Sequence, residues 1–228
     1  MKDPTFILVH GAWSGSWCWR ELERTLDEFH VASRSVNLPS ARLGAEVATD
    51  LFNDAQHVAQ AADDLDHVVL VGHSYGGAVI SEAAPLMRGL QQLIYIAALV
   101  PNKGESATEA GRAVRVRTEL DDAIEVDGDY LRLNKTRARS ALFGQCDVSV
   151  QEWAIQRLTT QTIASFRSLR TSDSTGAASL YIKCRSDRAI DPGLQNVMAT
   201  RCDEHVELES DHSPFLSHPL EIAHAMLD

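Results

Sequence analysis

The feature that most constrains this chain is a glycine-rich turn with a serine at its centre. The residues Gly72-His73-Ser74-Tyr75-Gly76-Gly77 follow an apolar run at 67–71 and precede a stretch of small residues at 78–87. A continuous apolar run is typical of a central parallel strand that is buried on both faces. The spacing G-x-S-x-G then predicts a strand-to-helix turn so tight that Ser74 takes a strained backbone conformation, since glycines remove the side chains that would collide with it.

Elsewhere in the chain, short apolar runs alternate with longer amphipathic stretches. This alternation predicts the α/β class, with a mostly parallel, doubly wound sheet of about six strands. The expected strands are 6–9, 30–36, 67–71, 93–100, 179–184 and 205–208, and the expected helices include 21–29, 48–62, 78–87 and 219–227.

The segment 105–175 differs from the rest of the chain, because charge is dense, strand patterns are missing and helical stretches occur at 150–160 and 163–169. We therefore expect one domain over 1–228. Its core would comprise 1–104 and 176–228, with an inserted helical cap at about 105–175.

Charge and composition exclude several kinds of function. A formal net charge of −11 disfavours nucleic acid and anionic membranes as partners. The four cysteines match no zinc spacing and the nine histidines include no H-E-x-x-H motif, so we expect no metal site. No apolar stretch reaches the roughly 18–20 residues of a membrane span, and the first residues lack the pattern of a secretory leader. These patterns predict a cytoplasmic location and leave a homodimer open.

The serine turn indicates nucleophilic chemistry. A serine on such a turn projects above the carboxyl ends of the strands, where open α/β sheets bind ligands. Its oxyanion hole needs two backbone N–H groups, one of them from the residue after the nucleophile. We expect these amides to belong to Tyr75 and to Ala12, because His10-Gly11-Ala12-Trp13 directly follows the first strand. Gly11 has the alternative interpretation of a plain strand-ending glycine.

The base and the acid should follow Ser74 in the chain, the acid first. His212 lies just after the last expected strand, and the rival histidines are His205, His218 and His224. Asp187 lies just after the preceding strand and would hold the tautomer of His212 that accepts the serine proton.

Three other acids compete with Asp187. Asp191 precedes Pro192 and has the pattern of a helix N-cap. Asp211 is adjacent to His212 in the chain, which is poor geometry for orienting it, and Glu105 begins the cap.

These motifs together resemble one branch of the α/β-hydrolases, which includes plant methylesterases, hydroxynitrile lyases and small bacterial esterases. The resemblance covers the whole chain and is weakest in the cap. It implies the α/β-hydrolase fold, no cofactor, and cleavage of small esters or lactones or of a carbon–carbon bond in cyanohydrins. The lyases of this branch carry a lysine directly after the catalytic histidine and a threonine in the first loop. Here Ser213 and Gly11 occupy those places, which favours hydrolysis.

The substrate pocket is expected to be apolar, as small-molecule sites usually are. We place there, from the cap and the loops, the residues Trp13, Tyr75, Leu142, Phe143, Trp153 and Phe215. The leading hypothesis is a serine hydrolase that cleaves a small, mostly apolar carboxylic ester through an acyl-enzyme. The alternatives are a lactonase or carbon–carbon lyase that uses the same triad, and a non-catalytic small-molecule receptor on a hydrolase scaffold.

Overall fold

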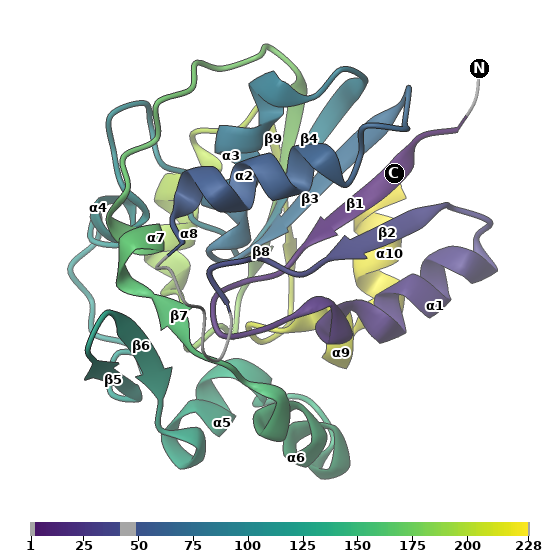
Figure 1. Cartoon of the computed structure of the whole chain (residues 1–228). Helices are drawn as coiled ribbons and strands as arrows, with labels where there is room; N and C mark the ends of the chain where they lie inside the picture. The colour runs from purple at the N-terminus through teal and green to yellow at the C-terminus, as the bar shows by residue number, and fades with distance from the viewer. Residues whose placement is uncertain (1–2, 42–48, 228) are drawn as a thin grey trace.

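In the computed structural model, which describes residues 3–41 and 49–227, six parallel strands form one central sheet (Figure 1). The strands are β1 (Thr5–Val9), β2 (Ser33–Val36), β3 (Val68–His73), β4 (Leu90–Ile96), β8 (Ala178–Cys184) and β9 (Glu204–Leu208). Their order across the sheet is β2-β1-β3-β4-β8-β9, with every neighbouring pair parallel. The predicted sheet of about six parallel strands is confirmed. The chain winds outward in both directions from the neighbours β1 and β3, the kind of position where open α/β sheets bind ligands.

Helices cover both faces of this sheet. Figure 1 shows α1 (Arg20–Glu28) and α10 (Pro219–Leu227) on one face, with α2 (Leu51–Gln60) and α3 (Gly76–Ala83) on the other. Helix α8 (Pro192–Ala199) packs against β8. The remaining short elements outside the insertion are α9 (Pro214–Ser217) and the 3₁₀ turns η1 (Ser16–Trp19) and η2 (Ala84–Leu86).

Element boundaries differ from the predicted ones where the backbone turns. The strand expected at 30–36 begins only at Ser33, because His30 is in the left-handed region with φ of 60°. The strand expected at 93–100 ends at Ile96, before Ala97 with φ of 42°. Helix α2 begins at Leu51 because the Asp50 side chain accepts hydrogen bonds from the amides of its first turn. Residue 48, where this helix was expected to begin, lies outside the described residues.

The insertion between β4 and β8 is not purely helical, which corrects the predicted helical cap. Its elements are α4 (Ala107–Ala110), β5 (Ile124–Asp127), β6 (Tyr130–Leu133), α5 (Lys135–Phe143), α6 (Val148–Arg157), β7 (Gln161–Thr162) and α7 (Ile163–Arg167). The three strands form an antiparallel sheet in the order β5-β6-β7. The missed signal is the alternation Ile124-Glu125-Val126-Asp127 before Gly128, whose φ of 59° suits a two-residue hairpin loop.

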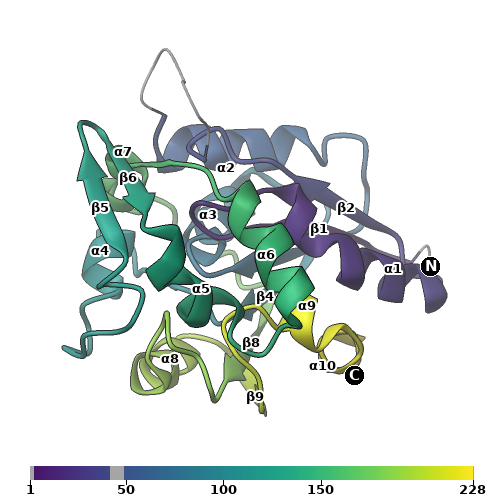
Figure 2. The ribbon, with the colours of Figure 1, turned by 90° about the horizontal axis from the view of Figure 1, so that it is seen from below.

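The insertion lies over the carboxyl ends of the central strands. Seen from that side, α6 lies in front of the sheet, whereas β5 and β6 lie beside it (Figure 2). The buried core continues from the sheet into the insertion through Ala138, Leu142 and Phe143 of α5. Within residues 3–41 and 49–227, no helix is long and apolar enough to cross a membrane.

We expect Gly76→Ala to destabilise the fold strongly, because a Cβ at Gly76 would lie 2.5 Å from the backbone oxygen of Val9. Overpacking against backbone should cost about 3 kcal/mol of unfolding free energy, or roughly 6–12 °C in Tm for a domain of this size. Thermal denaturation followed by circular dichroism measures this shift. Gly111→Ala is the matched control, since its nearest neighbour would be 3.3 Å away at a φ of −63°. Equal Tm values for the two variants would contradict a close-packed turn.

Candidate active site

Ser74 occupies the turn between β3 and α3 with a φ of 53°, in the left-handed region that side chains other than glycine rarely adopt. A Cβ at Gly72 would lie 2.6 Å from the carbonyl oxygen of Gly76, so both flanking glycines are needed for backbone clearance. The end of β4 and the segment after it hold the turn, because Ser74 N donates to Ile96 O at 3.2 Å and Leu99 N donates to Ser74 O at 3.0 Å. The structure therefore has the strained turn that the G-x-S-x-G spacing predicts.

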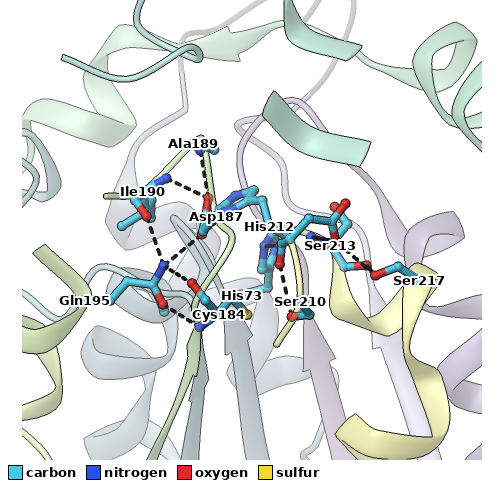
Figure 3. Close-up of polar contacts among 12 residues, drawn as sticks. His73, Cys184, Asp187, Ala189, Ile190, Gln195, Ser210, His212, Ser213 and Ser217 are labelled. Carbon is cyan, nitrogen blue, oxygen red and sulfur yellow. Dashed lines mark hydrogen bonds and ion pairs between the residues drawn. The ribbon is translucent and has the colours of Figure 1, made fainter. Parts of the chain in front are cut away.

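His212 and Asp187 form a buried pair after the ends of β9 and β8. His212 Nδ1 lies 2.8 Å from Asp187 Oδ2, and the two side chains are 2% and 0% exposed (Figure 3). The other carboxylate oxygen of Asp187 accepts from the amides of Ala189, at 2.7 Å, and Ile190, at 2.9 Å. A carboxylate held in this way fixes the proton of His212 on Nδ1 and leaves Nε2 free to act as a base.

Gln195 completes the surroundings of the Asp187 carboxylate, and sequence reasoning missed it. Its Nε2 donates to Asp187 Oδ2 at 3.0 Å and to Ile190 O at 2.9 Å, while its Oε1 accepts from Cys184 N at 2.8 Å (Figure 3). A fully buried amide with these contacts cannot rotate freely. Its position on α8, four residues after the cap Asp191, becomes meaningful only when the direction of that helix is known.

His73, the residue before Ser74, supports the loop that carries His212. Its Nε2 lies 2.8 Å from the His212 carbonyl oxygen, which can only accept, so Nε2 carries the proton. The two imidazole rings lie 4.5 Å apart between centroids. Burial and the nearby His212 lower the pKa of His73 well below its ordinary value, so this ring stays neutral. Its Nδ1 has no hydrogen-bond partner among the described residues.

The first loop is held by His10. Leu38 N donates to His10 Nε2 at 3.0 Å, so Nδ1 carries the proton and donates to Gly11 O at 2.7 Å. Burial lowers the pKa of His10 to about 4, which keeps this tautomer neutral. In a trans peptide the carbonyl and the following N–H point in opposite directions. Fixing the Gly11 carbonyl therefore also fixes the direction of the Ala12 N–H.

The rival acids and histidines lie elsewhere or have other partners. Asp191 caps α8 by accepting from Gly193 N and Leu194 N. Asp211 accepts from Gln145 N of the insertion at 2.9 Å and from Ser217 Oγ at 2.9 Å, so it ties the His212 loop to the insertion. Glu105 forms an ion pair with Arg201. Among the rival histidines, His205 is exposed on β9. His218 contacts Ser217, and the His224 ring packs against Phe29.

Two cavities meet at Ser74. The smaller, of about 20 Å³, has room for roughly one water molecule. It is lined by Ser74 and His212 together with Ala12, Trp13, Leu142, Phe143, Ser213 and Phe215, among others. The larger has a volume of about 380 Å³, within the ~300–1,000 Å³ typical of small-molecule sites. Its lining includes Trp13 and Ser74 and many apolar residues that sequence reasoning missed, such as Leu99, Leu131, Ile163, Phe166, Ile190 and Leu194.

Trp153 is not part of either cavity lining, which corrects its predicted place in the substrate pocket. Its ring packs edge-on against Trp17 at 5.2 Å and lies within 4.2–4.3 Å of the guanidinium groups of Arg20 and Arg157. Such cation–π contacts explain its position on α6 without a ligand. Leu142, Phe143, Trp13 and Phe215 do line the small cavity with Ser74 and His212. The Tyr75 side chain is fully buried and lines neither cavity.

The described residues contain no group of three or more histidine, cysteine, aspartate or glutamate side chains that could hold a metal ion. The four cysteines are free thiols, three of them buried and Cys202 partly so.

Comparisons with known proteins identify the family to which this fold belongs. The model of a family described as "Alpha/beta hydrolase family" matches residues 6–225. Methylesterase 17 of Arabidopsis thaliana is 27% identical over 96% of this chain and 88% of its own length. A carbendazim hydrolyzing esterase of a Nocardioides strain is 39% identical over 44% of each chain. A pyrethroid hydrolase of Sphingobium faniae JZ-2 has the same fold, with a TM-score of 0.86 at 22% identity over 99% of this chain and 96% of its own.

The predicted resemblance to methylesterases and bacterial esterases is thereby confirmed, and so is the predicted fold. Because the family model spans nearly all of the described chain, this protein belongs to the alpha/beta hydrolase family.

Proposed function

We propose that this hydrolase cleaves carboxylic esters, with Ser74 as the nucleophile, His212 as the general base and Asp187 as the residue that orients it. The observation that carries the proposal is the buried His212–Asp187 pair at 2.8 Å, with His212 lining the same small cavity as Ser74. The relatives named as esterases support the ester bond as the target.

In the proposed reaction, Ser74 Oγ attacks the ester carbonyl carbon while His212 Nε2 takes the hydroxyl proton. The amides of Ala12 and Tyr75 hold the negative oxygen of the tetrahedral intermediate. His212 then returns the proton to the departing alkoxide, which leaves as the alcohol. A water molecule attacks the acyl-enzyme by the same route, and the acid and free Ser74 are released. The small cavity, with room for about one water beside His212, suits this second step.

The larger cavity supports an apolar group on the substrate. Its lining is dominated by aliphatic and aromatic side chains, which include Phe166 and Leu131 from the insertion and Leu194 from the core. Esters with an acyl or alkyl chain of several carbons would bury that chain here. Lactones are cyclic esters that react through the same two steps, so turnover of a lactone beside an open-chain ester measures this preference.

Cyanohydrin cleavage is disfavoured by the first loop. A Cβ at Gly11 would lie 2.8 Å from Ser74 Cβ and 2.9 Å from His73 Nδ1, so the threonine of the lyases would not fit here. The buried Ser213 after His212 supplies no cation for a departing cyanide.

A cytoplasmic location and a homodimer stay predictions.

We expect Ser74→Ala to lower kcat for p-nitrophenyl butyrate by about 10³-fold or more, because the acyl-enzyme cannot form. Release of p-nitrophenol measures this rate. Ser81→Ala is the matched control, since Ser81 is a buried serine of α3 whose hydroxyl contacts Gly77 O and Tyr95. Turnover by Ser74→Ala at the rate of this control would exclude Ser74 as the nucleophile.

Leu131→Trp should shorten the acyl chain that the larger cavity accepts. We expect kcat/KM for p-nitrophenyl octanoate to fall at least tenfold while that for the acetate changes less than about threefold, since each buried methylene contributes roughly 0.8 kcal/mol. Arg132→Trp is the control, because Arg132 is exposed on β6 and pairs with Asp127. If both esters lose the same factor, the larger cavity does not bind the acyl chain.

A further inference from the structure

Asp54 of α2 is a fully buried carboxyl group outside the triad. Its Oδ1 accepts from Ser40 N at 3.0 Å, and its Oδ2 accepts from the Tyr75 hydroxyl at 2.8 Å and from Ser40 Oγ. No lysine, arginine or histidine of the described chain lies within ion-pair distance of it. Among the described residues, all donors to this carboxyl are neutral, and one of them belongs to the residue after Ser74.

The protonation states fix the direction of these hydrogen bonds. Burial raises the pKa of Asp54 to about 6, so the group is ionised at neutral pH and accepts from all three donors. Burial and the neighbouring carboxylate raise the pKa of Tyr75 well above its ordinary value, so its hydroxyl keeps its proton. A buried carboxylate is costly to keep, and the described residues supply no cation to this one. Its place therefore calls for a role beyond filling space.

The same network reaches the first loop and the insertion. Ser40 Oγ accepts from Gln161 Nε2 at 2.7 Å, and Gln161 Oε1 accepts from Trp13 N at 3.4 Å. Gln161 is fully buried on β7. The Phe166 ring lies 5.1 Å from the ring of Tyr75 and 5.8 Å from that of Trp13. Asp54 is therefore joined to Tyr75 directly, and to the residue after Ala12 through Ser40 and Gln161.

We propose that Asp54 is a positioning residue for the oxyanion hole. Anchoring the Tyr75 hydroxyl fixes the peptide group between Ser74 and Tyr75, which carries the Tyr75 N–H. The hydrogen bonds through Ser40 and Gln161 fix the loop that carries the Ala12 N–H. Oxyanion donors act only when they lie about 2.7–3.1 Å from the developing charge, so a small shift of either amide weakens the transition state more than the bound ester. This inference rests on the proposed ester hydrolysis.

The test compares Tyr75→Phe and Asp54→Asn with the wild-type chain. We expect kcat for p-nitrophenyl butyrate to fall about 10–100-fold with KM changed less than threefold, after active sites are counted by burst titration. Affinity for an alkyl trifluoromethyl ketone, whose adduct with serine carries an oxyanion, should fall by a similar factor. A merely structural role would lower Tm without changing either quantity per active site.

Tyr95→Phe is the matched control, because Tyr95 is also a buried tyrosine with a hydrogen-bonded hydroxyl. That hydroxyl lies 3.0 Å from Ser81 Oγ of α3, the helix that follows Tyr75. This variant should keep wild-type kcat and ketone affinity. Tyr75→Phe removes a single oxygen atom, so it tests the same hydrogen bond if Asp54→Asn does not fold. If the wild type hydrolyses esters and Tyr75→Phe keeps the wild-type kcat and ketone affinity, the positioning role of Asp54 is overturned, while the proposed function stands. A wild type that hydrolyses no ester overturns the proposed function, and this role with it.

Discussion

The φ of 53° at Ser74 is the constraint on which the rest of the site depends. A serine in this conformation needs flanking residues without side chains, and Gly72 and Gly76 meet that need. A Cβ at either glycine would lie only 2.5–2.6 Å from a backbone carbonyl oxygen. The strain is held by neighbours on both sides. The last residue of β4, Ile96, accepts from the amide of Ser74, and Leu99 beyond that strand donates to its carbonyl. The turn leads directly into α3.

A parallel sheet then explains how groups distant in the chain meet at this turn. The carboxyl ends of β1, β3, β8 and β9 lie on one edge, so the loops after them supply Ala12, Ser74, Asp187 and His212. His73 contacts the carbonyl of His212 across 139 residues of chain. Nearly every buried polar group here has a partner, as a low-dielectric interior requires. In the proposed hydrolysis, pre-set hydrogen bonds of this kind let the site bind developing charge without rearranging.

The sequence was informative wherever a local pattern carries its own geometry. The turn at Ser74, the order of Asp187 and His212 after their strands, and the capping role of Asp191 all depend on a few adjacent residues. What the sequence did not reveal depends on side chains that meet only after folding. Gln195 and Asp54 have no local signature, because their partners lie on other elements. The β5–β6 hairpin was missed in a segment dense in charge, and Trp153 was misplaced because an aromatic residue alone does not say which face of its helix is buried.

Reaction with a fluorophosphonate tests the central claim most directly, because it reports the reactivity of Ser74 without any choice of ester. The account predicts one phosphonyl adduct per chain, located by peptide mass spectrometry at Ser74, forming at least 100-fold more slowly in His212→Gln, where the base is missing. A folded chain that forms no adduct, or forms it at another residue, would contradict the account and favour a binding protein on a hydrolase scaffold.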